Sequence, residues 1–301
     1  MDWYHLSLLS SLFLGFYEIA KKVSLKDNAV APVLFFNVLT QCGCYLPAVI
    51  SQRLLHLNAP VEWMTIEPLT WHQHLLLATK SVIAGSSWIF ASFAIKHLPM
   101  SIASPIRATS PVATILIAVA FLGERPTVSQ WIGVLIIIIS MYAFSLVGRK
   151  EGIRFHRNRW VWLMIVATLL GACSSLYDKY LLQTRNFSTA TVQAWFSIYL
   201  VPMMIPISLM WYLRQRSASR FEWRWSIPAI AMLLLISDFL YFYAIEQPGA
   251  LMAVISPLRR TSVIVSFIAG VLIYGEKNWK QKAVCIVSLL AGVCVISLLG
   301  D

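Results

Sequence analysis

The stretch SPIRATS at residues 104–110 occurs a second time, as SPLRRTS at residues 256–262. Each copy continues through an uncharged apolar segment that ends in a charged corner, GER at 123–125 and GEK at 275–277. Across the two segments, seven mostly non-apolar residues are identical at one constant offset of 152. Chance rarely keeps so many identities in register, so the sequence predicts an internal duplication.

The overall composition is that of a membrane protein. Apolar residues make up 58% of the chain and charged residues 12%, and the mean hydropathy is +0.71. A soluble domain carries roughly 25% charged residues. The apolar runs reach the length of about 20 residues that a bilayer requires. The first residues lack a basic region and a small-residue cleavage site, so we expect no cleaved signal peptide.

The net charge of +11 comes from basic residues in short segments between the apolar runs. That placement is typical of cytoplasmic loops and does not predict a nucleic-acid partner. The five cysteines lie in apolar runs without metal-ligand spacing, and the pair His72 and His74 lacks a third ligand. No catalytic constellation or nucleotide-binding loop is present. We therefore expect no enzyme activity, no cofactor and no metal, with energy supplied by a gradient or by exchange.

Ten membrane-spanning helices are predicted, since lipid offers no partner to an open backbone. The predicted spans cover residues 3–20, 30–50, 75–95, 99–122, 128–148, 160–181, 190–212, 226–245, 250–273 and 280–299. The chain then divides into a first five-helix repeat at 1–148, a basic linker at 149–159 and a second five-helix repeat at 160–301.

The two halves match beyond the opening stretch. Tyr-Glu at 17–18 aligns with Tyr-Asp at 177–178, and Ala-Ile at 94–95 aligns with Ala-Ile at 244–245. Because each half has an odd number of spans, the second half must enter the membrane from the opposite side. The predicted fold is an all-α membrane protein built from two inverted repeats, an arrangement that many secondary transporters use.

Loop charges predict an orientation. Sixteen Lys or Arg residues fall in the loops after the odd-numbered spans, and five fall in the termini and the other loops. The positive-inside rule then places the odd-numbered loops in the cytoplasm and both termini outside. In this count Lys21 and Lys282 belong to the odd-numbered loops, and Lys80 to the others.

Ten spans in two halves, each with a proline-started fourth span that ends in Gly-Glu-Arg or Gly-Glu-Lys, resemble the EamA type of the drug/metabolite transporter superfamily. The resemblance covers nearly the whole chain. It implies a secondary transporter or exporter with a central cavity between the halves, worked by alternating access, and termini in the cytoplasm. Its members move amino acids, other metabolites, drugs, nucleotide sugars or phosphorylated compounds. The lysine and arginine count gives the opposite orientation.

Arg107 and Arg259 are the first candidate site residues. They lie eight and nine residues into spans 4 and 9, roughly 12–14 Å below the helix start and close to the membrane midplane. An unpaired guanidinium there is costly and usually functional. Its planar fork matches a carboxylate or phosphate, so both side chains are candidates for substrate binding. The alternative is a buried ion pair with Glu18, Asp178 or Asp238.

Arg260 has no counterpart in the first half, where Ala108 stands. It projects about 100° round the helix from its neighbour and is a further candidate for substrate contact. Trp88 of span 3 and Tyr241 and Tyr243 of span 8 are candidates for lining the cavity, although aromatic residues in a membrane bundle more often serve packing.

Glu18 and Asp178 are the aligned acids of spans 1 and 6. Lys21, Lys22 and Lys179 lie nearby, so one interpretation is local ion pairs near an interface. The other is that one acid titrates and couples proton entry to substrate exit, because burial raises the pKa of a carboxyl group.

Asp238 lies in the middle of span 8, with no basic residue near it in sequence. A partner must come from another span, which makes Asp238 a candidate proton carrier or arginine partner. Glu124 and Glu276, at the charged corners, have the pattern of structural helix ends. Pro105, Pro111 and Pro257 are expected to bend or loosen spans 4 and 9.

The function predicted from these features is a secondary active transporter in the inner membrane that exports small organic metabolites or drugs with an anionic group. Proton coupling is one option for its energy source. The alternative is a flippase in which the same arginines grip the phosphate of a lipid-linked substrate. The expected partners are a small-molecule substrate and the lipid bilayer, with the chain acting as a monomer or a homodimer.

Overall fold

The computed structural model describes residues 3–59, 64–113, 116–117, 127–150, 155–214, 219–247, 255, 258–275 and 278–298. Regular structure within these residues is entirely helical. The α-helices are α1 (Trp3–Leu25), α2 (Val30–Val49), α3 (Trp71–His97), α4 (Met100–Ala108), α6 (Val128–Lys150), α7 (Arg159–Lys179), α8 (Thr189–Arg214), α9 (Ser226–Glu246), α11 (Ser262–Tyr274) and α12 (Trp279–Leu298). Two π-helical turns, η1 (Ile50–Leu54) and η4 (Tyr180–Thr184), extend α2 and α7, and a short 3-10 helix, η3 (Phe155–Arg157), precedes α7.

Each of these α-helices falls on one of the ten predicted spans, which confirms the all-α prediction. Five helical segments of the described chain are long and apolar enough to cross a membrane on their own. They are Val30–Leu54, Trp71–His97, Arg159–Thr184, Thr189–Arg214 and Ser226–Glu246. The helix ends follow local chemistry: Thr70 and Gln73 form a capping box at the start of α3, and Gly275, with φ of 61°, ends α11.

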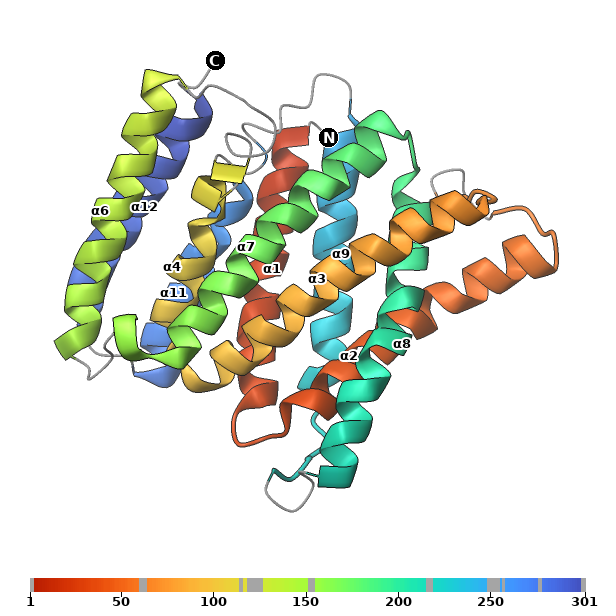
Figure 1. The fold of residues 1–301 in the computed structure, drawn as a ribbon, viewed down its shortest axis with the longest axis horizontal. Coiled ribbons are helices and arrows are strands. Elements are labelled where there is room, and N and C mark those ends of the chain that lie inside the picture. Colours follow the sequence, from red (N-terminus) through yellow and green to blue (C-terminus); the bar gives the residue numbers. More distant parts are fainter. Residues whose placement is uncertain are drawn as a thin grey trace.

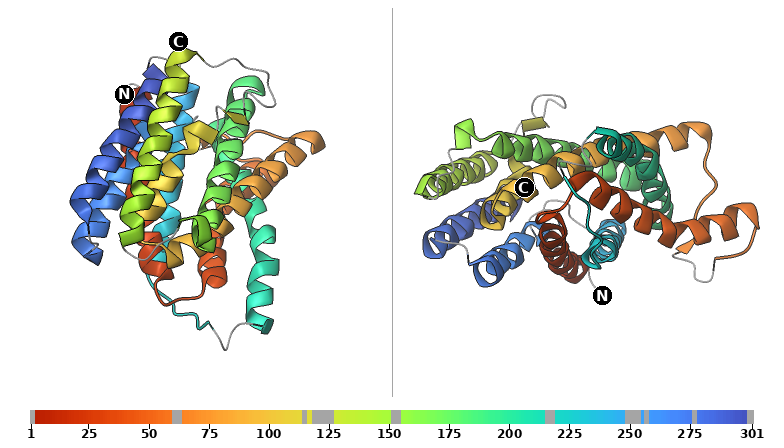
Figure 2. Two further views of the ribbon diagram at one scale, coloured as in Figure 1. Left: turned by 60° about the vertical axis from the view of Figure 1, so that its left-hand side comes forward. Right: turned by 90° about the horizontal axis from the view of Figure 1, so that it is seen from below.

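The helices form two layers that face each other (Figures 1 and 2). One layer holds α6, α4, α7, α3 and α8, and the other holds α12, α11, α1, α9 and α2. The α6–α12 pair lies at one end of the molecule and the α2–α8 pair at the other. The remaining helices pack between these two pairs.

The packing has the symmetry of an inverted repeat. The most extensive helix contacts are α1–α9, α6–α12, α3–α7 and α2–α8. In the two halves α1 is equivalent to α7, α2 to α8, α3 to α9 and α6 to α12. Exchanging each helix for its equivalent turns the α1–α9 pair into the α7–α3 pair and leaves α6–α12 and α2–α8 unchanged. The equivalent helices α1 and α7 also run in opposite directions (Figure 1). The structure therefore relates the halves by a pseudo-two-fold axis in the membrane plane, as predicted.

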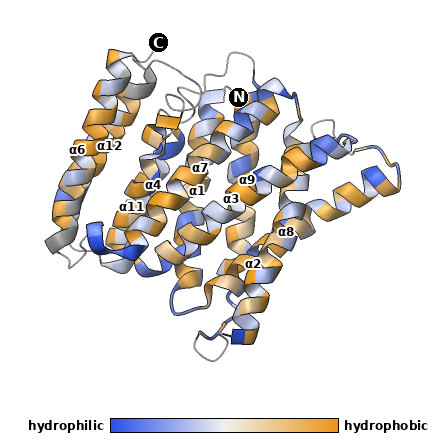
Figure 3. Ribbon diagram, viewed as in Figure 1, coloured by the Kyte–Doolittle hydropathy of each residue, from blue (hydrophilic) through white to orange (hydrophobic). Residues whose placement is uncertain are grey.

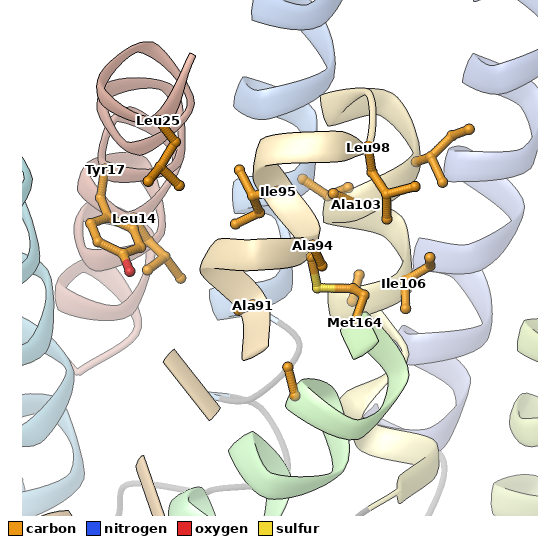
Figure 4. Close-up of a cluster of buried hydrophobic side chains, with 14 of the residues drawn as sticks. Leu14, Tyr17, Leu25, Ala91, Ala94, Ile95, Leu98, Ala103, Ile106 and Met164 are labelled. Atoms are coloured by element: carbon orange, nitrogen blue, oxygen red, sulfur yellow. The ribbon is translucent and has the colours of Figure 1, made fainter. Parts of the chain in front are cut away.

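The apolar core lies where the layers meet. In Figure 4, Met164 of α7 packs beside Ala94 of α3 and Ile106 of α4, while Leu14 and Tyr17 approach from α1. Many other large apolar side chains are exposed on the outside of the bundle, and hydrophobic residues predominate along most of its helices (Figure 3). Examples are Leu135, Ile138 and Ile139 on α6 and Leu209 and Leu213 on α8. A surface of this kind suits lipid, so the chain is a multi-pass membrane protein.

Three lysines assigned to loops by the sequence count lie inside the bundle. Lys21, Lys80 and Lys282 are 3%, 1% and 0% exposed and belong to α1, α3 and α12. Their assignment to loops was wrong, because the long aliphatic stem of lysine allows it to pack between helices. Without them, fourteen basic residues remain in the odd-numbered loops and four elsewhere. The count therefore still predicts that the odd-numbered loops are cytoplasmic.

Candidate functional site

Each half has a helix break one turn or less beyond its central arginine. In the first half the backbone N–H of Thr109 donates to the carbonyl of Ile106 at 3.2 Å, and the Thr109 hydroxyl donates to the same carbonyl at 2.7 Å. Thr261 makes the same two bonds to Leu258, at 3.2 and 2.6 Å. A threonine hydroxyl that competes for the carbonyl three residues earlier tightens and interrupts an α-helix.

The break follows threonine rather than proline alone. Pro111 lies two residues after Thr109, but the equivalent residue after Thr261 is Val263. Spans 4 and 9 are therefore interrupted in both halves, as the sequence predicts. The cause common to both halves is the threonine, whereas the prediction rested on proline. Pro257, Glu124 and Glu276 lie outside the residues that the structure describes.

A cavity of about 120 Å³ lies between the halves, next to these breaks. Its charged lining consists of Lys21, Lys80, Arg107, Asp178, Asp238, Arg259 and Arg260. Both halves contribute to it, through α1, α3 and α4 of the first and through α7, α9 and residues 258–260 of the second. Trp88 of α3 also lines it, as predicted, together with Phe196 and Phe242. The cavity thus has a mixed surface of charged, hydroxyl and aromatic side chains.

Glu18 joins three helices beside this cavity. Arg107 of α4 donates from Nη1 to Glu18 Oε1 at 2.8 Å, and Ser104 of α4 donates to Oε2 at 2.7 Å. Ser266 of α11 donates to the same Oε2 atom. The carboxylate is 5% exposed. Glu18 therefore links α1 to the equivalent helices α4 and α11 of both halves.

The lysines next to Glu18 in sequence have other partners. Lys21 Nζ donates to the hydroxyl of Tyr17 at 3.1 Å. Lys22 Nζ donates at 2.6 Å to the carbonyls of Ile95 and Leu98, at the end of α3. The local ion pair that one interpretation of the sequence predicted is replaced by the pair with Arg107, because the carboxylate points toward the bundle centre.

Arg259 is held by two residues of α9. Its Nη2 donates to Asp238 Oδ1, and its guanidinium lies 3.9 Å from the centre of the Tyr241 ring. Arginine packs well on an aromatic face, and a desolvated contact of this kind adds about 2 kcal/mol. The Asp238 partner comes from another span, as the sequence required. Tyr241 packs against Arg259 and is not among the residues that line the cavity.

Tyr243 lies elsewhere. It is 39% exposed and stacks on Phe239, with ring centres 6.0 Å apart. Five residues after Asp238 on a helix, it projects about 140° away from that carboxylate and toward the outside of the bundle. The prediction that Tyr241 and Tyr243 line the cavity is not supported, since the described lining includes neither.

Asp178 pairs across the halves with Lys80 of α3. The two side chains are 9% and 2% exposed. The Lys80 ammonium also lies over two aromatic rings, 4.8 Å from the centre of Phe196 and 4.4 Å from that of Phe242. This box of one carboxylate and two rings was missed from the sequence. Its signal was present, because Lys80 is a charge inside a predicted span.

Arg260 differs from the other two arginines of the site. It lines the cavity, its Nε is buried without a hydrogen-bond partner, and no carboxylate pairs with it among the residues that the structure describes. The site as a whole therefore offers three cation–carboxylate pairs and one unpaired guanidinium. Within the described part of the chain, no group of His, Cys, Asp and Glu has the arrangement of a metal site.

Such an arrangement is suited to binding an anion in the middle of the membrane. Arg107 and Arg259 are each engaged by a carboxylate, so an incoming anion must compete for them, whereas it meets the donors of Arg260 directly. Charged groups in a low-dielectric cavity interact strongly, and each pair that breaks or forms changes which helices are linked.

Comparison with known proteins gives a family and a fold. The model of the EamA-like transporter family matches residues 1–146 and 158–298. The comparison with curated proteins gave no match. One solved crystal structure aligns with a TM-score of 0.63 and 13% sequence identity, over 98% of this chain and 97% of the other. At that identity the likeness shows a shared fold alone.

Proposed function

Because the chain belongs to the EamA-like transporter family, we propose that it is a secondary active transporter that exports small organic solutes with an anionic group across the inner membrane. The observation that carries this proposal is the cavity between the inverted halves, with charged side chains from both halves at mid-span. A transporter of two inverted repeats binds its substrate near the midplane and opens to one side at a time.

In this proposal the repeats are residues 1–148 and 160–301, joined by the basic linker 149–159, and one chain suffices for transport. The ion pairs make the cavity responsive to its contents. A proton taken up by Glu18 or Asp238 would release Arg107 or Arg259 from its carboxylate. A substrate anion would do the same by competition. Either event loosens a link between helices, which supplies the coupling that alternating access needs.

Transport by the purified chain in proteoliposomes tests the proposal. Groups of small organic anions, zwitterions and neutral solutes are supplied outside, with and without an imposed pH gradient. We expect uptake of organic anions above that of protein-free liposomes, and faster uptake with the gradient that favours proton antiport. Absence of uptake for every group would contradict the proposal. Movement of a lipid-linked phosphate between leaflets, without solute uptake, would replace it with the flippase alternative.

A further inference from the structure

The charges of the cavity do not balance. Five cations line it, namely Lys21, Lys80, Arg107, Arg259 and Arg260. Three carboxylates face them, and each is already paired: Asp178 with Lys80, Asp238 with Arg259, and Glu18 with Arg107. Lys21 and Arg260 are the two lining cations that have no carboxylate partner in the described part of the chain. The formal surplus is two positive charges.

Arg260 makes this surplus costly. A guanidinium does not lose its proton in a protein, so Arg260 carries its charge at every physiological pH. At mid-membrane an uncompensated charge is strongly disfavoured. The buried Nε of Arg260 has no hydrogen-bond partner either. An unpaired donor of this kind costs free energy unless a ligand oxygen accepts from it.

Lys21 supplies the second charge when an anion is bound, because a nearby negative charge favours its protonated form. Its Nζ donates to the Tyr17 hydroxyl at 3.1 Å and lies 5.4 Å from the centre of the Tyr17 ring. Both contacts orient the ammonium without neutralising it, because the phenol is uncharged. Lys21 and Arg260 each interact electrostatically with the Arg107–Glu18 pair. The two unpaired cations therefore belong to one electrostatic cluster around that pair.

We propose, resting on the transport function above, that this cavity binds a small solute with two negative charges, held through an oxyanion group by Arg260 and balanced by Lys21. The chemical class is a phosphate monoester or a dicarboxylate. The fork of Arg260 matches the planar carboxylate or the phosphate oxygens, and Lys21 acts as a point charge. Arg107 and Arg259 are already paired with Glu18 and Asp238, so the dianion first meets Arg260 and Lys21.

Binding to the purified full-length chain in detergent tests the proposal, read as ligand-induced thermal stabilisation. The probes are glycerol 3-phosphate and succinate as dianions, propionate as the monoanion and glycerol as the neutral control. We expect both dianions, or one of them, to bind at least about tenfold more tightly than propionate, with no effect of glycerol. Preference for one dianion then identifies phosphate or carboxylate as the recognised group.

Three variants separate the roles. Arg260→Gln should weaken dianion and monoanion binding by about tenfold or more, while Lys21→Met should reduce only the preference for dianions over monoanions. Arg185→Gln removes an equal charge at the helix end after η4 and should leave both affinities unchanged. Arg260→Lys keeps the charge without the fork, and partial loss is expected there even if Arg260→Gln does not fold.

Two results would overturn the inference: neither succinate nor glycerol 3-phosphate binding more tightly than propionate to the unaltered chain, or an unchanged dianion affinity in folded Arg260→Gln or Arg260→Lys. The proposed transport function fails separately. Dianion binding without movement of any solute into proteoliposomes would remove the function and keep the binding site. Uptake of organic monoanions alone, unaffected by succinate or glycerol 3-phosphate, would keep the function and remove the inference.

Discussion

In the first half of the molecule, Glu18 of α1 pairs with Arg107 of α4 within the same half. The aligned acid of the second half, Asp178 of α7, pairs with Lys80 of the other half. Arg259 is the second-half equivalent of Arg107, but it pairs with Asp238 and not with Asp178. The two halves thus keep equivalent charges in equivalent places and connect them differently.

Two half-specific residues explain the change. At the offset of 150 that aligns α3 with α9, Lys80 stands opposite Ile230 and Asp238 stands opposite Trp88. Lys80 supplies Asp178 with a cation, and Asp238 supplies Arg259 with an anion. Two half-specific charges thus account for both pairs that depart from the repeat symmetry, one between the halves and one within the second half.

The arginines also differ in freedom. The Arg107 side chain is 27% exposed and that of Arg259 is 13% exposed. Tyr241 lies under Arg259, whereas the equivalent residue of α3 is Ala91, which provides no ring. Arg107 is therefore the more exposed of the two and lacks the ring contact that Arg259 makes.

The largest expected effect comes from breaking the pair between halves. Lys80→Met leaves Asp178 buried without its cation, and removal of one partner of a buried pair costs about 3–5 kcal/mol. We expect a loss of that size in the free energy of unfolding, measured by denaturant titration in detergent. The loss should be accompanied by weaker association between α3 and α7, detectable as faster proteolysis of the loops that precede them.

A matched variant controls for the substitution itself. Ile230→Met places the same side chain at the equivalent position of the second half, where no charge is removed, and should cost less than about 1.5 kcal/mol. The double variant Lys80→Met with Asp178→Asn removes the stranded charge and should recover most of the loss. A double variant as unstable as Lys80→Met would show that the aromatic contacts, and not the charge pair, hold the halves.

The second comparison concerns how closely the inner helices approach. A Cβ atom on Gly15 of α1 would lie 2.5 Å from Cβ of Val265 on α11. The equivalent residue of α7 is Ser175, so the second half tolerates a side chain there. Gly15→Ala should destabilise the protein by about 1–3 kcal/mol through overpacking. Thermal unfolding in detergent measures this.

Gly43→Ala is the control for the change of residue type. A Cβ at Gly43 meets nothing within 4 Å, and alanine favours the helix over glycine by about 1 kcal/mol. The expected result is unchanged or slightly higher stability. Equal destabilisation by both variants would argue against a close α1–α11 contact.

The sequence was informative where the membrane imposes a rule. Apolar runs had to be helices, and a repeat with an odd number of spans had to be inverted, so the fold followed from the chain alone. The depth expected for Arg107 and Arg259 came from the rise of a helix. Their partners did not, because pairing depends on the rotation and register between spans, which side-chain packing decides. The pair of Lys80 and Asp178, separated by 98 residues, is an example.

Some of the missed residues had a signal that was not used. Lys80 lies inside the predicted span 75–95 and meets the same criterion that selected Arg107. Lys21 followed the end of the predicted span 3–20, while the helix itself continues to Leu25. A span drawn five residues longer would have placed Lys21 within the membrane. The role of Tyr241 under Arg259 had no such signal, since a stacking contact between helices leaves no pattern in sequence.

The smallest expected effect tests the outer loops, where the halves differ in length. The loop that leads to α3 docks on the second half, with the Glu67 N–H donating to Thr191 Oγ1 at 2.8 Å. Burial raises the pKa of the half-buried Glu67 carboxyl, the nearby Glu246 adds to the rise, and a hydrogen bond with the Ser188 backbone partly offsets it. The folded protein therefore holds the Glu67 proton more tightly than the unfolded chain does. Stability contributed by this group is fully present below the ordinary glutamate pKa of about 4.3 and falls as pH rises through the higher folded value.

Glu67→Gln removes that loss. We expect it to raise the free energy of unfolding at pH 7 by no more than about 0.5 kcal/mol, seen as a slightly higher unfolding temperature. The difference from the unaltered chain should vanish near pH 4. Gln183→Glu adds a carboxylate to the same surface pocket, which Glu67 and Glu246 line. It should lower the stability at pH 7. Since repulsion among carboxylates acts only when they are ionised, both differences must shrink together as the pH falls. A Glu67→Gln difference that persists at pH 4 would trace the effect to packing of the loop on α8 and not to its charge.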